Sequence, residues 1–209
     1  MILHGYFRST ASWRVRIALN LKGLVAEQVF HHLRKGEQRA PDYLALNPQG
    51  LVPALITDDG AVLTQSLAIC EYLDEQYPGP ALLPADALDR ARVRAVAQVI
   101  ACDIHPVQNL KVLQNLRDLG LAEAAVQGWA AEVIETGLDA VDRLLADTTG
   151  PFAFGETPTL ADLCIVPQLG NARRFNVALR WPRLLEIEAA CLALDAFRSA
   201  APGAQPDAE

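Results

Sequence analysis

The sequence predicts two domains, an α/β domain over residues 1–80 and an all-helical domain over residues 87–200. Short apolar runs alternate with helical patterns in the first segment, whereas the second has helical periodicity along its length. Between them, residues 77–84 are rich in proline and glycine, which is typical of a linker. A chain of 209 residues is long enough for two modest domains that each bury a core.

The α/β domain begins with a predicted strand–helix–strand unit. An apolar run over residues 2–7 predicts the first strand, and the next helix repeats an apolar residue every fourth position, at Trp13, Ile17 and Leu21. Lys22-Gly23 marks the end of this helix, with the glycine in a left-handed conformation. Residues 25–33 alternate well enough for a second strand, which such a unit places parallel to the first.

The second half of this domain is predicted to be a hairpin followed by a helix. Residues 34–50 are polar, which indicates an irregular connection with one short helix near Tyr43. Asp58-Asp59-Gly60 then joins two short apolar runs, residues 54–57 and 61–64, and predicts a tight antiparallel hairpin. A helix follows over residues 65–76. The order βαβ and then ββα is that of a thioredoxin-like domain.

The second domain is predicted to contain only helices. Residues 87–119 form one long helical pattern with an expected kink at Pro106, and residues 123–146 form a second helix. Thr159 and Asp162 have the spacing of a capping box at the start of a third helix, and we interpret them as structural. One or two helices follow Pro182, and the tail after residue 202 is expected to fray.

Composition excludes several classes of protein. The formal net charge of −7, with no basic stripe, argues against a general nucleic-acid binder. No apolar run approaches the roughly 20 residues that span a bilayer, and Met1 leads directly into the first strand, so we expect a cytoplasmic protein without a signal peptide. The cysteines form no Cys-x-x-Cys pair, so we expect no metal site and four buried free thiols: Cys70, Cys102, Cys164 and Cys191.

Hydroxyl side chains mark the start of the first helix. Ser9, Thr10 and Ser12 can accept hydrogen bonds from the free N–H groups there, as ordinary capping residues do. The same free N–H groups and the positive end of the helix dipole can instead hold an anion, and Arg8 adds a permanent cation. The local sequence leaves these two interpretations about even.

Residues 6–17 (Tyr-Phe-Arg-Ser-Thr-Ala-Ser-Trp-Arg-Val-Arg-Ile) closely resemble the signature of the zeta-class glutathione transferases, the maleylacetoacetate isomerases. That signature is usually written Ser-Ser-Cys-x-Trp-Arg-Val-Arg, so Ser9 and Thr10 stand at its two serines. Ala11 replaces its cysteine, which puts in doubt any mechanism that needs a protein thiol at this position. The resemblance implies the glutathione transferase architecture, glutathione as cofactor and a homodimer.

Pro53 enters a predicted strand from a turn and is a candidate for a cis peptide bond, although an ordinary loop proline is the alternative. In the cis form, the N–H and C=O of Val52 would point out of the sheet, free to pair with a peptide backbone. The resemblance implies that Val52 and Pro53 clamp the cysteinyl backbone of glutathione.

Gln65 and Ser66 stand at the start of a helix that could take a carboxylate, although Ser66 could merely be an N-cap. The resemblance implies that this pair binds the γ-glutamyl carboxylate. We assign Gln38 to the same cofactor site.

The helical domain contributes a second group of candidates. His105, Gln108 and Asn109 lie in a polar patch near Pro106 that could contact the glycyl end of glutathione or the substrate, although a helical histidine is more often structural. Arg174 precedes a phenylalanine, as in the family, and with Arg8 it would hold the two carboxylates of a substrate, although such arginines usually make surface ion pairs. His31 and His32, adjacent on a strand, would point to opposite faces, cannot share a metal, and receive no role.

The resemblance implies a glutathione-dependent cis–trans isomerase of a dicarboxylic keto acid in aromatic catabolism. Conversion of maleylacetoacetate to fumarylacetoacetate is the first choice, and maleylpyruvate isomerase is the near alternative, since members of that kind also depart from the cysteine. An alternative from a different enzyme class is a glutathione transferase that acts on small α-halo acids. A non-catalytic scaffold ranks last, because Ser9, Val52-Pro53 and Gln65-Ser66 are all retained.

Overall fold

The computed structural model describes residues Met1–Glu209. The chain divides into two compact units. Unit 1 consists of Met1–Leu83 together with Leu192–Glu209, and unit 2 consists of Pro84–Cys191. The units are therefore not two consecutive stretches, because the end of the chain packs with the beginning.

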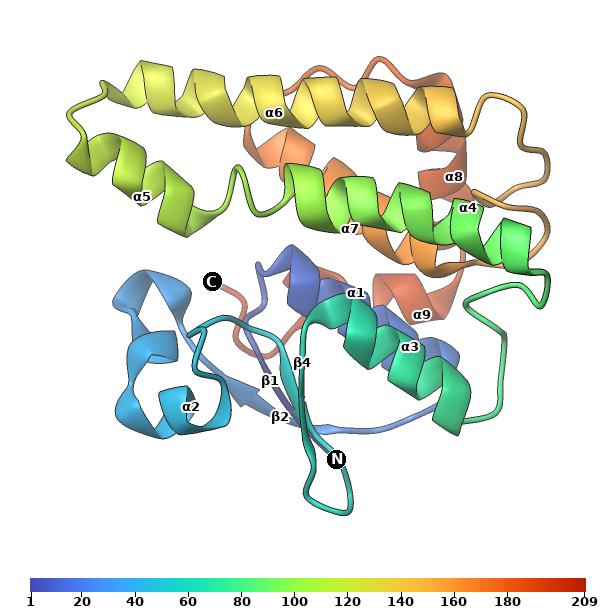
Figure 1. The fold of residues 1–209 in the computed structure, drawn as a ribbon, viewed down its shortest axis with the longest axis horizontal. Helices are drawn as coiled ribbons and strands as arrows, with labels where there is room; N and C mark the ends of the chain where they lie inside the picture. Colours follow the sequence, from blue (N-terminus) through green and yellow to red (C-terminus); the bar gives the residue numbers. More distant parts are fainter. The chain divides into compact units, whose positions relative to one another are not determined.

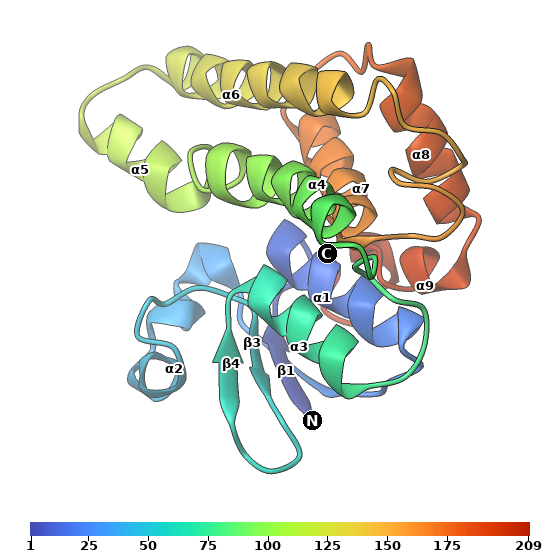
Figure 2. The same ribbon diagram turned by 45° about the vertical axis from the view of Figure 1, so that its right-hand side comes forward.

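Unit 1 is built on a four-stranded mixed sheet in the order β2-β1-β3-β4 (Figures 1 and 2). Its strands are β1 (Ile2–Gly5), β2 (Glu27–Phe30), β3 (Ala54–Ile56) and β4 (Val62–Thr64). β1 pairs with β2 in parallel and with β3 antiparallel, and β3 and β4 form the predicted hairpin. This topology confirms the thioredoxin-like fold. β2 is shorter than expected, and Val25 before it is 90% exposed.

The main helices of unit 1 are α1 (Thr10–Leu21) and α3 (Ser66–Gln76), which pack against each other beside the sheet (Figure 1). Their apolar side chains, including Val15, Ile17, Ile69 and Leu73, are completely buried. Each such side chain contributes roughly 1.5–3 kcal/mol by leaving water. Gly23 follows α1 with a φ of 65°, as predicted.

Shorter helices complete unit 1. The connection after β2 holds two 3₁₀ turns, Leu33–Lys35 and Glu37–Arg39, and α2 (Pro41–Leu46) around the buried Tyr43. At the other end of the chain, α9 (Asp195–Arg198) contacts α1, and a 3₁₀ turn covers Pro202–Ala204.

Unit 2 is entirely helical, as predicted (Figure 2). Its helices are α4 (Ala87–Gln98), α5 (Leu110–Asp118), α6 (Glu123–Leu144), α7 (Leu160–Arg174) and α8 (Pro182–Leu192). The last residue of α8 lies just beyond the unit boundary. A π-helical turn, Val99–Ile104, follows α4 and packs against α6. Gly137 of α6 permits this approach, because a Cβ there would lie 2.2 Å from the Ile104 side chain.

The prediction of a single kinked helix over residues 87–119 is wrong. α4 passes into the π-helical turn, and α5 starts afresh after a turn. Two local causes act here: Pro106 supplies no N–H, and the Asn109 side chain accepts a hydrogen bond from the Lys111 N–H at 3.1 Å, which caps α5.

The tail after residue 202 is not frayed. Gln205 is buried and donates hydrogen bonds to the carbonyls of Ser199 and Ala201, at 2.8 and 2.9 Å. Two residues later, Asp207 accepts a hydrogen bond from the Phe7 N–H at 2.9 Å. Local hydrogen bonds and one partner 200 positions away therefore hold a segment whose composition resembles a loose terminus.

Two smaller expectations also fail. His31 and His32 lie beyond the end of β2, so they do not alternate on a strand. His31 instead pairs with His4 (Nε2 to Nδ1, 2.9 Å), and burial lowers the pKa of both imidazoles. All four cysteines are free thiols, but Cys102 is exposed, so only Cys70, Cys164 and Cys191 are buried.

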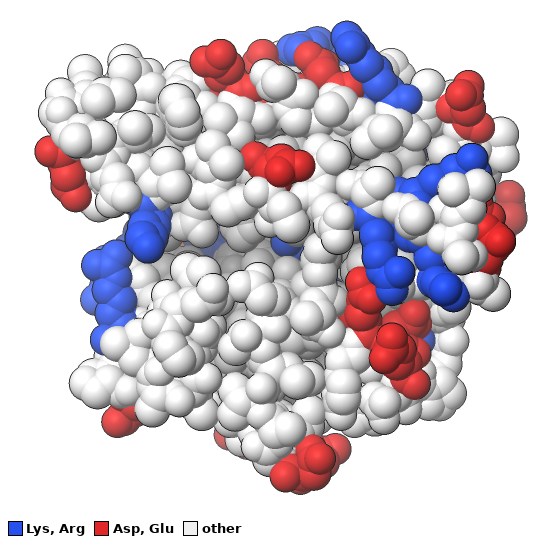
Figure 3. All heavy atoms as spheres, in the orientation of Figure 1, with Lys and Arg blue, Asp and Glu red and all other residues white.

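None of the helices combines the length and the hydrophobicity that a membrane span requires. On the face drawn in Figure 3, basic side chains occur in separate groups, with acidic and uncharged surface between them.

Candidate active site

The register of the sheet brings three predicted loops to one edge of unit 1. β1 and β3 pair His4 with Ala54, and β3 and β4 pair Ala54 with Thr64. The chain leaving β1, the chain entering β3 and the chain leaving β4 therefore emerge at the same edge. These segments carry Ser9, Val52 and Ser66, respectively.

Ser9 is the N-cap of α1. Its Oγ accepts a hydrogen bond from the Ser12 N–H at 3.1 Å, and its own N–H donates to the Tyr6 carbonyl at 3.0 Å. Capping uses a lone pair of the hydroxyl and leaves its proton available for donation. The capping and anion-binding interpretations of Ser9 are therefore compatible. Thr10 follows as the first helical residue, and its buried hydroxyl has no partner within the protein.

Groups from α1 and the C-terminal tail hold the loop between β1 and α1. Asp207 accepts from the Phe7 N–H, while the Arg16 guanidinium donates to the Phe7 carbonyl at 3.1 Å and to the Ala200 carbonyl at 2.9 Å. Burial lowers the pKa of Arg16 to about 10, and the nearby Asp207 carboxylate acts in the opposite direction. Asp207 could not be predicted from the sequence, because no local pattern links residues 200 positions apart. Arg8 lies over the Phe7 ring, with 5.5 Å between Cζ and the ring centroid.

The Val52–Pro53 peptide bond is cis, as predicted. The preceding carbonyl, that of Leu51, accepts hydrogen bonds from the Tyr43 hydroxyl at 2.6 Å and the Asn47 amide at 2.7 Å. Neither the N–H nor the C=O of Val52 has a hydrogen-bond partner within the protein. The structure thus fixes the residue before Val52 and leaves both polar groups of Val52 unsatisfied.

The start of α3 also has unused donors. The first hydrogen bond of this helix runs from the Ile69 N–H to the Gln65 carbonyl at 3.0 Å, and no side chain caps it. The N–H groups of Ser66, Leu67 and Ala68 are therefore without partners in the protein. Gln65 has a φ of 69° and a ψ of 115°, a costly conformation for a residue with a side chain. Its amide donates to Gln49 Oε1 at 2.9 Å.

Arg14 lies behind this helix start and is another residue for which no role is predicted from the sequence. The side chain is 1% exposed, and its Nη1 donates to Ser66 Oγ at 3.3 Å. Its Nε and Nη2 are buried without partners. No signal in the sequence shows the environment of this arginine. Arg16 is also an arginine, two positions later in the same helix, and has different partners.

Gln38 lies in the second 3₁₀ turn, against the loop that leads to Val52. Its amide donates to the Leu33 carbonyl at 3.4 Å, while its Oε1 is buried without a partner. Its backbone carbonyl would lie 3.2 Å from a Cβ at Gly50, so the two segments are in close contact.

In unit 2, three of the candidates cluster around the break between α4 and α5. His105 follows the π-helical turn, Gln108 is buried with an unpartnered Oε1, and Asn109 is the N-cap of α5. The cap gives Asn109 a structural role that the sequence-based interpretation did not include.

Arg174 ends α7, donates to the Asn171 side chain and lies over the Phe175 ring at 5.3 Å. Its neighbour Arg173 differs, because it forms an ion pair with Glu188 on α8. No group of three or more His, Cys, Asp or Glu side chains is arranged to hold a metal ion.

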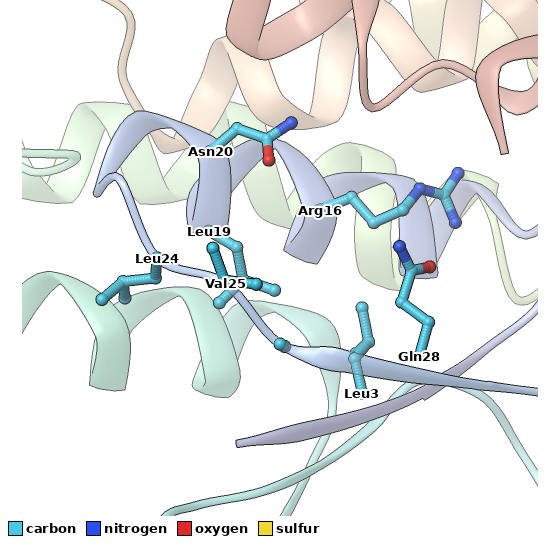
Figure 4. A pocket seen from close by; sticks show the side chains of 8 residues that line it. Leu3, Arg16, Leu19, Asn20, Leu24, Val25 and Gln28 are labelled. Carbon is cyan, nitrogen blue, oxygen red and sulfur yellow. The ribbon is translucent and has the colours of Figure 1, made fainter.

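A separate cavity of about 160 Å³ lies in unit 1 beside α1 and β2 (Figure 4). Its lining includes Arg16, Asn20 and Gln28, and none of the predicted site residues. Asn20 is occupied by hydrogen bonds to Ala196 and Ser199, and Arg16 by backbone carbonyls. This cavity is distinct from the edge that carries Ser9, Val52 and Ser66.

Family models match nearly the whole chain. The model of the glutathione S-transferase N-terminal domain matches residues 8–76, and that of the C-terminal domain matches residues 85–190. The maleylpyruvate isomerase of Ralstonia sp is 53% identical over 99% of both chains. The maleylacetoacetate isomerase of Pseudomonas aeruginosa is 51% identical over 99% of this chain and 98% of the relative.

Solved structures agree with these matches. A holo structure of maleyl pyruvate isomerase, described as a bacterial zeta-class glutathione S-transferase, has a TM-score of 0.96 and 52% identity, with complete coverage of both chains. A maleylacetoacetate isomerase from Methylobacterium extorquens AM1, solved with malonate and glutathione bound, has a TM-score of 0.96 and 42% identity, again with complete coverage.

Proposed function

This chain belongs to the zeta class of the glutathione S-transferase family, and we propose that it is a glutathione-dependent cis–trans isomerase that converts maleylacetoacetate to fumarylacetoacetate. The observation that carries the proposal is the single edge of unit 1 where Ser9, Val52 and the open start of α3 come together. A tripeptide with two carboxylates and a thiol matches these unused donors and acceptors.

The γ-glutamyl and cysteinyl parts of glutathione have matching groups in the domain of residues 1–80. The three free N–H groups and Ser66 suit the γ-glutamyl carboxylate, because a helix start favours an anion. The unpaired N–H and C=O of Val52, next to Pro53, suit the cysteinyl backbone. Gln65 and Gln38 would complete this site. His105, Gln108 and Asn109, from the helical domain of residues 87–200, would contact the glycyl end or the substrate.

Ser9 would hold the thiol of glutathione as a thiolate. A free thiol has a pKa near ~8.5, and only the thiolate is nucleophilic. The free proton of the Ser9 hydroxyl, the start of α1 and the Arg8 cation all favour the anion, with Thr10 as a second donor. Lowering the pKa by about 1.5 units requires about 2 kcal/mol, which a charge-assisted hydrogen bond and a helix dipole can supply.

When bound, glutathione supplies a thiolate that adds reversibly to the conjugated cis double bond, which allows rotation about that bond before the thiolate leaves. The arginines Arg8 and Arg174 would hold the two carboxylates of the keto acid and stabilise negative charge that develops next to its ketone. Malonate, which is bound with glutathione in the Methylobacterium relative, is likewise a dicarboxylate. Ala11 leaves no protein thiol at the start of α1, so the thiol of glutathione would be the nucleophile.

Maleylpyruvate isomerase is the second candidate, because a relative and a solved structure with that name are 53% and 52% identical to this chain. The decisive experiment gives the purified protein maleylacetoacetate and maleylpyruvate separately, with and without glutathione, and compares kcat/KM. We expect activity only with glutathione and a higher kcat/KM for maleylacetoacetate. A higher value for maleylpyruvate would reassign the substrate, and no turnover of either compound would overturn the proposal.

We further propose that the protein acts as a cytoplasmic homodimer, since a symmetric dimer is the commonest oligomer and the family resemblance implies one. Light scattering at micromolar concentration should give twice the 22.6 kDa chain mass. A monomer mass would contradict this assignment.

A further inference from the structure

The least expected charge in unit 1 is the guanidinium of Arg14. It is almost completely buried, yet it makes one hydrogen bond, to the uncharged Ser66 hydroxyl. Its Nε and Nη2 have no partner, and no carboxylate forms an ion pair with it. Buried charges in proteins are normally paired, because removing an ion from water without a counter-charge is costly.

The surroundings of Arg14 make this charge more unfavourable. The start of α3 is the positive end of that helix dipole. The N–H groups of Ser66, Leu67 and Ala68 at this start have no acceptor in the protein. A cation beside a helix N-terminus is repelled by it. Free donors, dipole and guanidinium therefore create a positive site that has no anion of its own.

The buried cation at the far end of the same helix is placed differently. Lys22, at the C-terminal end of α1, forms a 2.7 Å ion pair with Asp74 of α3. Arg14 and Lys22 are eight positions apart, which separates the two by roughly 12 Å along the helix. The fold thus supplies a carboxylate to Lys22 and none to Arg14.

We propose that Arg14 is a positioning residue for glutathione, whose γ-glutamyl carboxylate supplies the missing counter-charge at the start of α3. This inference rests on the proposed function and names a residue that acts through Ser66. Because Nη1 donates to Ser66 Oγ, the hydroxyl proton of Ser66 is turned away from Arg14 and toward the bound carboxylate. The guanidinium also attracts the carboxylate through a medium of low dielectric constant.

The test compares two ligands that differ in one carboxylate. Glutathione and 4-aminobutyryl-cysteinylglycine, which lacks the α-carboxylate of the γ-glutamyl residue, are titrated into the full-length protein by calorimetry. Wild type should prefer glutathione strongly. In Arg14→Met the Kd for glutathione should rise by about tenfold or more, while the Kd for the truncated ligand stays nearly constant. Arg14→Lys, which keeps the charge, should recover most of the preference.

Lys22→Met is the matched control, since it removes a buried cation from the same helix but one that has its own carboxylate. It should lower the thermal stability of the ligand-free protein by leaving Asp74 unpaired, and it should not change the ratio of the two Kd values. Arg14→Met should leave the ligand-free Tm unchanged or raise it, and should reduce the Tm increase caused by glutathione.

Equal weakening of both ligands in Arg14→Met, or a wild type that does not discriminate between them, would overturn the proposal. If Arg14→Met fails to fold, Arg14→Gln is titrated in the same way with the same criteria. No keto acid is present in the titrations, so a wild type that binds glutathione in this manner but isomerises nothing refutes the proposed function alone.

Discussion

The starts of α3 and α7 differ in the charged side chain that lies beside them. At α7, Asp162 accepts hydrogen bonds from the Thr159 N–H at 2.7 Å, the Thr159 hydroxyl at 2.8 Å and the Ala153 N–H at 2.8 Å. At α3, no side chain caps the helix, and the nearest buried charge is the cation Arg14. One helix start carries its own carboxylate, whereas the other lacks one.

This contrast separates a structural helix start from the one that we propose to bind glutathione. A helix start whose donors are already satisfied by the chain has nothing to offer a ligand, however polar its residues are. An open start with a buried cation behind it gains stability only when an anion arrives. The start of α1 is intermediate, because Ser9 caps the helix and still retains a hydroxyl proton.

The largest effect is expected for Asp162→Ala, which would leave the donors at the start of α7 unsatisfied in a completely buried site. We expect a loss of about 3–5 kcal/mol in the free energy of unfolding, measured with urea. Asp162→Asn, which keeps one acceptor oxygen, should lose less. A change below roughly 1 kcal/mol for the alanine variant would contradict the structural role of this start.

Ser9→Ala should come next and should affect chemistry more than folding. Losing a hydrogen bond to the thiolate costs about 1.5–3 kcal/mol, or about ten- to a hundredfold in rate. The pKa of bound glutathione should rise, because the anion is less stabilised, so the pH–rate profile should move to higher pH. Ultraviolet absorbance of the thiolate across pH measures this shift.

Thr10→Ala is the control for that experiment and should shift the pKa less, and Ala11→Cys should be tolerated without becoming essential. If Thr10→Ala raises the thiol pKa while Ser9→Ala leaves it unchanged, the assignment of Ser9 as the main donor is wrong.

At the other end of α7, Arg174→Lys should lower kcat/KM for the keto acid by about tenfold, because lysine lacks the planar fork that binds a carboxylate through two hydrogen bonds. The affinity for glutathione should change less. Arg173→Lys is the neighbouring control, since Arg173 already pairs with Glu188. Equal kinetics in the two variants would remove Arg174 from the proposed site.

The smallest effect concerns the backbone at the start of α3. Gln65 has a φ of 69°, where a side chain is strained and glycine is not. Gln65→Gly should therefore be more stable than Gln65→Ala by about 1 kcal/mol in the absence of glutathione, since both variants lose the same side-chain hydrogen bond. Chemical unfolding of the two ligand-free variants tests this, and no difference would mean that the position is not strained.

The order of elements follows from the sequence because its signals are local. The turn at Asp58-Asp59-Gly60, the glycine after α1 and the box formed by Thr159 and Asp162 each depend on residues a few positions apart. Such interactions form with the same geometry in any chain that carries them. The loops that hold Ser9, Val52 and Ser66 could be named for the same reason, with the help of a family resemblance.

Other features required the tertiary structure. Asp207 reaches the Phe7 N–H across 200 positions, and the open edge of unit 1 exists only because the register aligns His4, Ala54 and Thr64. The sequence also shows an arginine at position 14 without showing that it is buried and unpaired. Burial and pairing depend on what the folded chain places around a side chain, and two arginines in one helix turn, Arg14 and Arg16, therefore acquire different partners and different roles.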